Sequence, residues 1–372
     1  MVYQPLTCQE ALDRGWEDMD RSERKVLVQS EQRKLLQVLR KLPQDNRPPS
    51  KAIDSWYELA PFQLRFNFDE YLSDVPDTIN GSKLPIPGAR AIIAPHAGYS
   101  YSGRCAAWAF RCLDLTNVKR VFVLGPTHRY PFSGLATSTF AKYTTPLGEF
   151  QVDQNTLSEI SEAASRAKAR ISNMPREHEL REHSLEMEIA FLYKRCEESF
   201  EKEEDFPKIL PMLVSGGPRD EKAIGKILAP YIADPTNAFV ISSDFCHWGE
   251  HFSDYRPYWP RNDPKKAVNL SSWDDHPTDP PIHETIRLLD QQAMDALETG
   301  VHDNFVNNLR ETENTVCGQH PIGAMMAALE LYSADRAEVE KPKFKVVRYN
   351  RSMMLTDPTD SSVSYVAAYA VL

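Results

Sequence analysis

Three short runs of apolar residues without alternation mark the middle of the chain. They cover residues 91–94, 121–124 and 238–241, and polar residues follow each of them. Runs of this kind are typical of strands that are buried on both faces of a sheet. Residues 104–113 follow the first run and carry apolar side chains at helical spacing. Strands that alternate with helices predict an α/β fold, with a mostly parallel or mixed central sheet flanked by helices on both faces.

The alternation continues toward the C-terminus. We predict further strands at residues 209–214, 343–349 and 362–371, the last apolar enough to be central. Predicted helices cover residues 64–72, 153–168, 183–196, 220–232, 284–298, 302–310 and 322–333. Residues 255–283 interrupt this rhythm with many prolines and tryptophans, and we interpret them as an insertion that forms a lid or an interface. Residues 51–372 are therefore predicted to form one α/β domain.

The first 50 residues differ in character from this domain. Residues 22–42 are rich in charge and place four apolar side chains on one helical face, and residues 43–50 have the composition of a linker. Two interpretations are open. The helix binds a partner, or it packs on its own domain or forms a loose extension. We favour the second interpretation and predict that residues 1–50 are a helical extension and linker outside the domain.

Side chains able to bind a metal or move a proton follow each of the three apolar strands. His96 lies after the first strand, His128 after the second and Asp244 after the third, with His247 three residues further on. The carboxyl ends of parallel strands meet at one edge of the sheet, where ligands bind in α/β folds. One histidine at a strand end is usually structural, but the repetition predicts a single site.

Composition and charge narrow the classes of function. The 372-residue chain has a net charge of −10 and an isoelectric point near 5.6, which argues against a general affinity for nucleic acid. No run approaches the ~20 apolar residues of a membrane helix, and we see no signal-peptide pattern. The six cysteines lie far apart without a CxxC pair, so we expect reduced thiols. These features predict a cytoplasmic protein with no membrane insertion.

Several motifs resemble those of a known family. In chain order they are APHAGYSYSG, LGPTH, EHSLEME, SSDFCHWG, CGQHPIG and DSSVSY. Together they resemble the MEMO (mediator of cell motility-like) family, from about Ala89 to the C-terminus. Only Ser55-Trp56-Tyr57 matches the HAGSWY motif that members carry near their start. The resemblance implies a fold similar to the catalytic subunit of class III extradiol dioxygenases, which are non-haem iron enzymes.

The resemblance also implies a metal site made of His96, His128 and Cys317. Asp244 and His247 lie beside it in MEMO-like proteins, and we take them as candidate catalytic residues. The dioxygenases have a carboxylate as third ligand, at the position that resembles Cys317 here. A thiolate is softer and can itself be oxidised, which weakens the case for ring cleavage and favours bound iron or copper. We also expect Cys317 to have a lowered pKa and to react readily.

Other residues of these motifs are predicted to surround the site. His183 and Glu186 share a helical face, and they either support the metal ligands from behind or form a buried ion pair. Tyr99 and Tyr101 border the mouth of the pocket or pack in the core. His320 bounds the pocket or has a structural role.

The favoured function is a MEMO-like metal-binding protein with a redox or signalling role. The resemblance further implies a role in cell motility, a nuclear as well as a cytoplasmic location, and a phosphopeptide or signalling protein as partner. Three alternatives stay open: a non-haem iron dioxygenase acting on a catechol-like substrate, an enzyme with Cys317 as nucleophile, and a metal-free peptide-binding adaptor.

Overall fold

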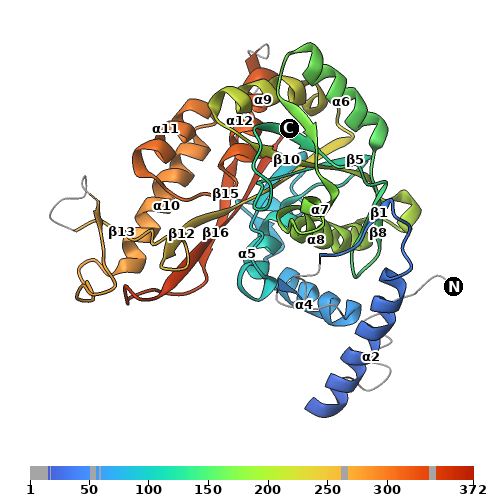
Figure 1. Cartoon of the computed structure of the whole chain (residues 1–372), viewed down its shortest axis with the longest axis horizontal. Coiled ribbons are helices and arrows are strands. Elements are labelled where there is room, and N and C mark those ends of the chain that lie inside the picture. The colour runs from blue at the N-terminus through green and yellow to red at the C-terminus, as the bar shows by residue number, and fades with distance from the viewer. Residues whose placement is uncertain (1–15, 17, 51–55, 58–59, 261–266, 335–340) are drawn as a thin grey trace.

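The centre of the molecule is a nine-stranded mixed sheet (Figure 1). The computed structural model describes residues 16, 18–50, 56–57, 60–260, 267–334 and 341–372. The strands of the sheet are β4 (Ala89–Ala94), β5 (Arg120–Gly125), β6 (Gly134–Thr137), β9 (Ile171–Asn173), β10 (Lys208–Ser215), β11 (Asn237–Ser242), β12 (Asp244–Gly249), β15 (Lys345–Arg351) and β16 (Ser361–Val371). Their order is β12-β16-β4-β11-β5-β10-β6-β9, with β15 paired to β16.

Four neighbouring strands in the middle of this sheet are parallel. They are β4, β11, β5 and β10, and their pairings run in register through the three apolar runs. Strands β16, β12, β15 and β6 join antiparallel at either side. Every residue of β4 and β11 is buried, which explains why these strands are apolar without alternation. The predicted α/β class with a mixed central sheet is confirmed.

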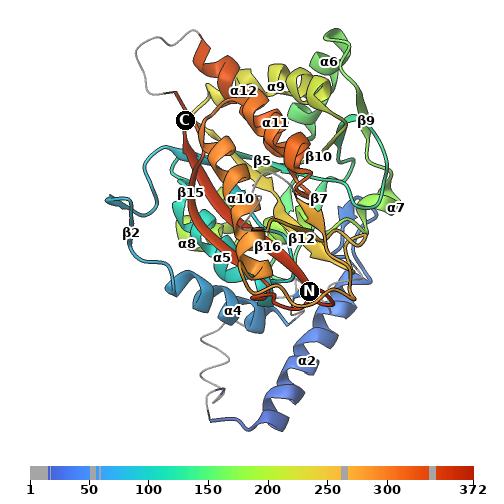
Figure 2. The same cartoon turned by 90° about the vertical axis from the view of Figure 1, so that its left-hand side faces the viewer.

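Helices cover both faces of the sheet (Figures 1 and 2). Helices α5 (Tyr99–Cys112) and α8 (Ser184–Ser199) pack on one face, and α9 (Pro218–Ile232) and α12 (Gln319–Ala334) pack on the other. Helix α11 (His302–Thr312) packs against α12, and α10 (Ile282–Glu298) packs against α11, while α4 (Pro61–Ser73) packs under α5 and α8. The smaller elements are α6 (Gln154–Arg166), α7 (Arg176–Glu179), η1 (Glu203–Asp205), β2 (Thr78–Ile79), β3 (Ser82–Lys83), β7 (Lys142–Thr144) and β8 (Glu149–Gln151).

Two elements near the predicted site differ from expectation. Helix α5 begins at Tyr99, five residues before the predicted start. Residues 244–249, for which no strand was predicted, form the edge strand β12. Phe245 and Trp248 in this strand are fully buried, and the strand pairs antiparallel with β16 through an irregular register between Asp244 and His247. Burial of these aromatic residues against a neighbouring element outweighs the polar character of the segment.

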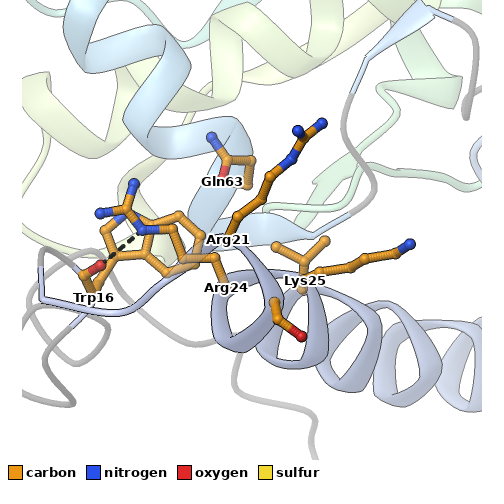
Figure 3. Close-up of a pocket in the computed structure, with 7 residues that line it drawn as sticks. Trp16, Arg21, Arg24, Lys25 and Gln63 are labelled. Atoms are coloured by element: carbon orange, nitrogen blue, oxygen red, sulfur yellow. Dashed lines mark hydrogen bonds between the residues drawn. The ribbon is translucent and has the colours of Figure 1, made fainter.

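The N-terminal helix α2 (Arg21–Leu39) projects beyond the body of the molecule in both views (Figures 1 and 2). Asp20 and Glu23 form a capping box at its start. Its Leu27 and Val28 pack near Phe62 of α4. Beside this contact lies an open hollow lined by Trp16, by α2 side chains that are mostly cationic or polar, and by Gln63 of α4 (Figure 3). Arg24 there donates to the Trp16 carbonyl.

The segment predicted as a linker makes sheet and ion-pair contacts with the domain. Residues Asn46–Arg47 form strand β1, which pairs with β7. Arg47 is 1% exposed, and its guanidinium bonds to the Glu186 carboxylate at 2.8 Å and to two carbonyl oxygens of residues 179 and 182. A domain boundary at residue 50 stays a prediction, but these contacts join residues 46–50 to the domain.

Within the described part of the predicted insertion, β13 (Pro257–Tyr258) pairs antiparallel with β14 (Val268–Asn269). Residues 261–266 of this segment lie outside the described part of the chain. Trp273 is 93% exposed. A lid or interface role for this segment stays a prediction. Among the described residues, no helix combines the length and apolar composition needed to cross a bilayer.

Candidate metal centre

His96 lies just beyond the carboxyl end of β4, where Pro95 ends the strand. Its side chain is buried, and its backbone N–H donates to Asp244 at 2.9 Å. The Nδ1 atom lies 2.7 Å from the hydroxyl oxygen of Ser242, which ends the neighbouring strand β11. Since Nδ1 is engaged with Ser242, Nε2 is the nitrogen that faces the site.

His128 follows β5 and approaches the same edge from the other side of β11. Its Nδ1 lies 2.9 Å from one oxygen of the Glu182 carboxylate, and its backbone N–H donates to the other oxygen at 2.7 Å. The ring of His128 is part-exposed, and its centroid lies 5.3 Å from that of His96. The carboxylate therefore holds His128 by its backbone and by its ring at once.

Cys317 completes the group from a third element, the loop before α12. Its Sγ lies 3.4 Å from Nε2 of His96 and accepts a hydrogen bond from the backbone N–H of Asp244 at 3.2 Å. Gly318 allows the loop to bring Cys317 to this place. A Cβ atom at residue 318 would overlap Ser243 and the Ser242 carbonyl oxygen. The Gly318 N–H also donates to the Ser243 hydroxyl at 3.0 Å.

The three predicted ligands converge. The ligand atoms of His96, His128 and Cys317 all lie within 4.8 Å of one another. Ligands bound tetrahedrally at about 2.0–2.3 Å lie about 3.5 Å apart, close to the separation of Cys317 and His96. Two imidazoles and one thiol, each oriented by a further hydrogen bond, fit a transition-metal ion. These residues could hold a metal ion, and their chemistry alone does not name it.

Asp244 and His247 lie beside these three residues and bond to the chain segments that carry them. Asp244 is buried, and burial raises the pKa of its carboxyl group to about 7, although the backbone N–H groups of His96 and Ala97 donate to it. His247 is held by Thr315, which accepts from its backbone N–H at 2.8 Å and whose carbonyl lies 3.0 Å from Nδ1. Burial lowers the pKa of His247, so its imidazole is neutral near pH 7. Their catalytic role stays a prediction.

Glu182 supports the candidate ligand His128, a role that the sequence interpretation considered for Glu186. The sequence interpretation overlooked Glu182. The Glu186 carboxylate instead bonds to Arg47, to the Ser50 N–H and to the Tyr57 hydroxyl, so its buried ion pair is made with Arg47 and not with His183. Glu182 is the first residue of the EHSLEME motif, and its place immediately before the histidine was the available signal.

His183 lies against the metal-competent group through its ring. Its centroid stacks 4.5 Å from that of His128, and the Trp56 ring lies 4.2 Å away on another side. Burial lowers the pKa of His183 to about 4, with a further contribution from the charge of His128. A second combination of His128, Glu182 and His183 also has ligand atoms within 4.8 Å. However, Glu182 already accepts hydrogen bonds from the backbone N–H groups of His128, His183 and Ser184.

The three residues predicted at the pocket border behave differently from one another. Tyr99 is buried, and its hydroxyl donates to the Met187 carbonyl, so it packs in the core. Tyr101 is 60% exposed on the first turn of α5. His320 contacts Glu221 at 2.7 Å through Nδ1, which is the structural alternative considered for it.

The electrostatics of the site correct the expectation for Cys317 and give Glu182 its charge. Burial raises the pKa of the Cys317 thiol well above its ordinary value, and the Asp244 charge adds to this effect, so the predicted low pKa is wrong for the metal-free protein. Burial opposes ionisation of Glu182, but hydrogen bonding and charge from His128, together with His183, lower its pKa to about 2. Glu182 is therefore a fixed negative charge behind His128.

The chain is similar to known proteins over most of its length. The family model described as "Memo-like protein" matches residues 47–369. The Caenorhabditis elegans protein named memo-1 homolog is 36% identical over 314 residues, which are 84% of this chain and 79% of the relative. Protein MEMO1 of Xenopus laevis is 36% identical over 320 residues (86% and 95%), and Protein MEMO1 of Homo sapiens is 34% identical over 314 residues (84% and 93%). The chain belongs to the Memo family.

Proposed function

We propose that this Memo-family protein binds one redox-active metal ion, iron or copper, through His96, His128 and Cys317, and acts in redox chemistry or signalling. The observation that supports the proposal is the convergence of two imidazoles and one thiol from three separate chain segments within 4.8 Å. When bound, the ion would supply Lewis acidity or one-electron chemistry.

The chain's own residues prepare the site for a cation. The hydrogen bonds of Ser242 and Glu182 engage Nδ1 of each histidine and leave Nε2 for the ion. The burial that raises the pKa of Cys317 opposes a free thiolate, so ion binding would have to displace the thiol proton. The fixed charge of Glu182 favours a cation at His128.

A ring-cleaving iron site is less well supported. Its third ligand would be a carboxylate, whereas the third group that meets both imidazoles here is the Cys317 thiol. The nearby Asp244 carboxylate is engaged by the backbone N–H of His96. A phosphopeptide or signalling-protein partner is part of the proposal only through the family resemblance.

Metal analysis of purified protein tests this proposal. After loading with copper or iron and desalting, the wild-type protein should retain about one ion per chain. His96→Ala should lose it while keeping the far-UV circular dichroism of the fold. His251→Ala is the matched control, because His251 is an exposed histidine and its hydrogen bond to the Ser361 hydroxyl is made by the backbone N–H, which the substitution keeps. Equal metal content in all three proteins would reject the site.

A further inference from the structure

Ser242 forms the centre of a small polar cluster behind His96. Its hydroxyl oxygen lies 2.7 Å from Nδ1 of His96, 2.8 Å from the carbonyl oxygen of Ser184 and 3.1 Å from Oε1 of Glu188. All four residues are 1% exposed or less, so bulk solvent does not reach these contacts. Glu188 lies one helical turn after Ser184 in α8, which places both groups on the same side of Ser242.

The number of hydrogens available to this cluster determines which atoms carry them. A serine hydroxyl has one hydrogen and can accept two more hydrogen bonds. The Ser184 carbonyl oxygen has no hydrogen, so its short contact requires that Ser242 donates to it. The other two contacts then need hydrogens from the partners. His96 must supply one from Nδ1, and Glu188 must supply the other as a neutral carboxylic acid.

Each other assignment leaves a short contact without a hydrogen. If Ser242 donated to an ionised Glu188, two oxygens would face each other at 2.8 Å with no hydrogen between Ser242 and Ser184. If Ser242 donated to His96, the same carbonyl contact would be unsatisfied. Two buried oxygen atoms at such a distance with no hydrogen between them repel each other, so these assignments are unfavourable.

We propose that Ser242 and a neutral Glu188 are positioning residues that fix the proton of His96 on Nδ1, so that Nε2 presents its lone pair beside Cys317. This inference rests on the metal-binding function proposed above, but it concerns the metal-free protein first. Burial raises the pKa of Glu188 well above its ordinary value despite the opposing effect of the Ser242 hydrogen bond, and the Asp244 charge acts in the same direction as burial, which agrees with the neutral acid required by the geometry.

The consequence is a histidine that needs no tautomer change before it binds a cation. The charge of the site is also reduced, since Glu188 adds no negative charge behind His96. Glu182, behind His128, is ionised by contrast. The two histidines are thus supported by different chemistry, a neutral hydroxyl–acid pair for His96 and a carboxylate for His128.

Two spectroscopic measurements on the metal-free, full-length protein test the proposal. Long-range ¹H–¹⁵N NMR with ¹⁵N-labelled histidine, assigned with His96→Gln, should show the His96 proton on Nδ1. The infrared difference spectrum between wild type and Glu188→Gln should contain the C=O stretch of a neutral carboxylic acid near pH 7. A proton on Nε2 of His96, or a carboxylate band in place of the acid band, would overturn the proposal.

Matched variants then connect the cluster to metal affinity. Glu188→Gln keeps a side-chain donor and should bind Cu²⁺ within about threefold of wild type. Ser242→Ala removes the acceptor for His96 and should weaken Cu²⁺ binding by about 10–100-fold, with a mixed His96 tautomer. Ser333→Ala, a buried serine of α12 bonded to the Glu330 carbonyl, is the control and should do neither.

The NMR and infrared spectra test the positioning cluster, and the Cu²⁺ titrations test the metal-binding function, so either can fail without the other. If wild-type protein binds no Cu²⁺ but shows Nδ1–H on His96 and a neutral Glu188, the proposed function fails and the positioning cluster stands. If Cu²⁺ binds at the site while Ser242→Ala has the wild-type tautomer and affinity, the positioning role is rejected. The wild-type NMR and infrared spectra decide the question even if Ser242→Ala does not fold.

Discussion

Oε1 of Glu182 lies 2.9 Å from Nδ1 of His128, and the same carboxylate accepts the backbone N–H of that histidine through its other oxygen. Both oxygens of Glu182 therefore contact His128, and together they fix the loop after β5 and the orientation of the imidazole ring. The carboxylate also accepts from the N–H groups of His183 and Ser184 at the start of α8, where negative charge is favourable.

Replacing this carboxylate should weaken metal binding without removing it. Glu182→Gln keeps the size of the side chain but loses the charge and one acceptor, so Cu²⁺ affinity should fall by about 10–100-fold. Isothermal titration calorimetry against a competing chelator measures the change. Glu177→Gln, an exposed position in α7, serves as control. An unchanged affinity in Glu182→Gln would mean that His128 does not depend on this support.

The ion pair between Arg47 and Glu186 should contribute strongly to stability. Both side chains are buried, and the Tyr57 hydroxyl and the Ser50 N–H complete the carboxylate's partners. Arg47→Met leaves that charge without its counterion, so the free energy of unfolding in urea should fall by about 3–5 kcal/mol.

A matched exposed pair provides the control for that change. Arg166→Met removes an exposed i, i+4 pair with Glu162 and should cost less than about 0.5 kcal/mol. By the same reasoning, deleting residues 1–42 should preserve the fold, whereas deleting residues 1–50 should destabilise it. If the two truncations are equally stable, the anchoring role of residues 46–50 is wrong.

Gly318 should be essential to the position of Cys317. A methyl group at residue 318 would overlap Ser243 and the Ser242 carbonyl, and backbone atoms cannot yield as a flexible side chain can. Gly318→Ala should therefore destabilise the fold by about 1–3 kcal/mol and also lower metal affinity. Gly217→Ala is a matched control, since a Cβ there meets no atom within 4 Å. Thermal unfolding and metal titration of both variants measure the difference, and equal behaviour would contradict the assigned role.

A second buried histidine gives a pH-dependent contribution to stability. Nε2 of His302 lies 2.7 Å from Glu221, and Nδ1 lies 2.8 Å from Asp303. Burial opposes protonation of His302, but these two carboxylates raise its pKa. Burial likewise opposes ionisation of Glu221, but His302 and His320 lower its pKa. A raised histidine pKa stabilises the folded state at pH below the ordinary value of about 6.5, and this contribution is lost as pH rises through the folded pKa.

The measurement is urea unfolding of wild type and His302→Gln at several pH values. The difference in unfolding free energy should be about 1–2 kcal/mol near pH 6 and should shrink toward about pH 9. Glu221, with its lowered pKa, stays ionised across this range. A difference that grows with pH would show that the neutral imidazole is the stabilising form.

The sequence predicted the sheet edge and the placement of His96 and His128 there, because both depend on local patterns. Apolar runs identify β4, β5 and β11, and the residues after each strand must meet at the carboxyl edge. Cys317 was different, because it reaches the site from a distant loop, and only the family motif pointed to it. Strand β12 was missed because its burial arises from packing against β16, which no local pattern records.

The supporting residues were the hardest to predict. Glu182 and Glu186 both lie near His183 in sequence, and helical spacing alone favours neither for a contact with His128. The partner of Glu186 is Arg47, 139 positions away. A long-range contact therefore decides that Glu186 pairs with Arg47 and that Glu182 supports His128. The Cys317 pKa was misjudged for a related reason: burial raises it more than the hydrogen bonds from the backbone of Asp244 and Gly318 lower it, and burial is a property of the folded chain.

X-ray absorption at the copper edge tests the joint role of His96, His128 and Cys317 most directly. The copper-loaded wild-type protein should show one sulfur and two imidazole nitrogens in the coordination shell. The sulfur contribution should disappear in Cys317→Ser, and one imidazole should disappear in His128→Ala. A wild-type shell without sulfur, or a sulfur signal that persists in Cys317→Ser, would contradict the assignment of these three residues as the metal ligands.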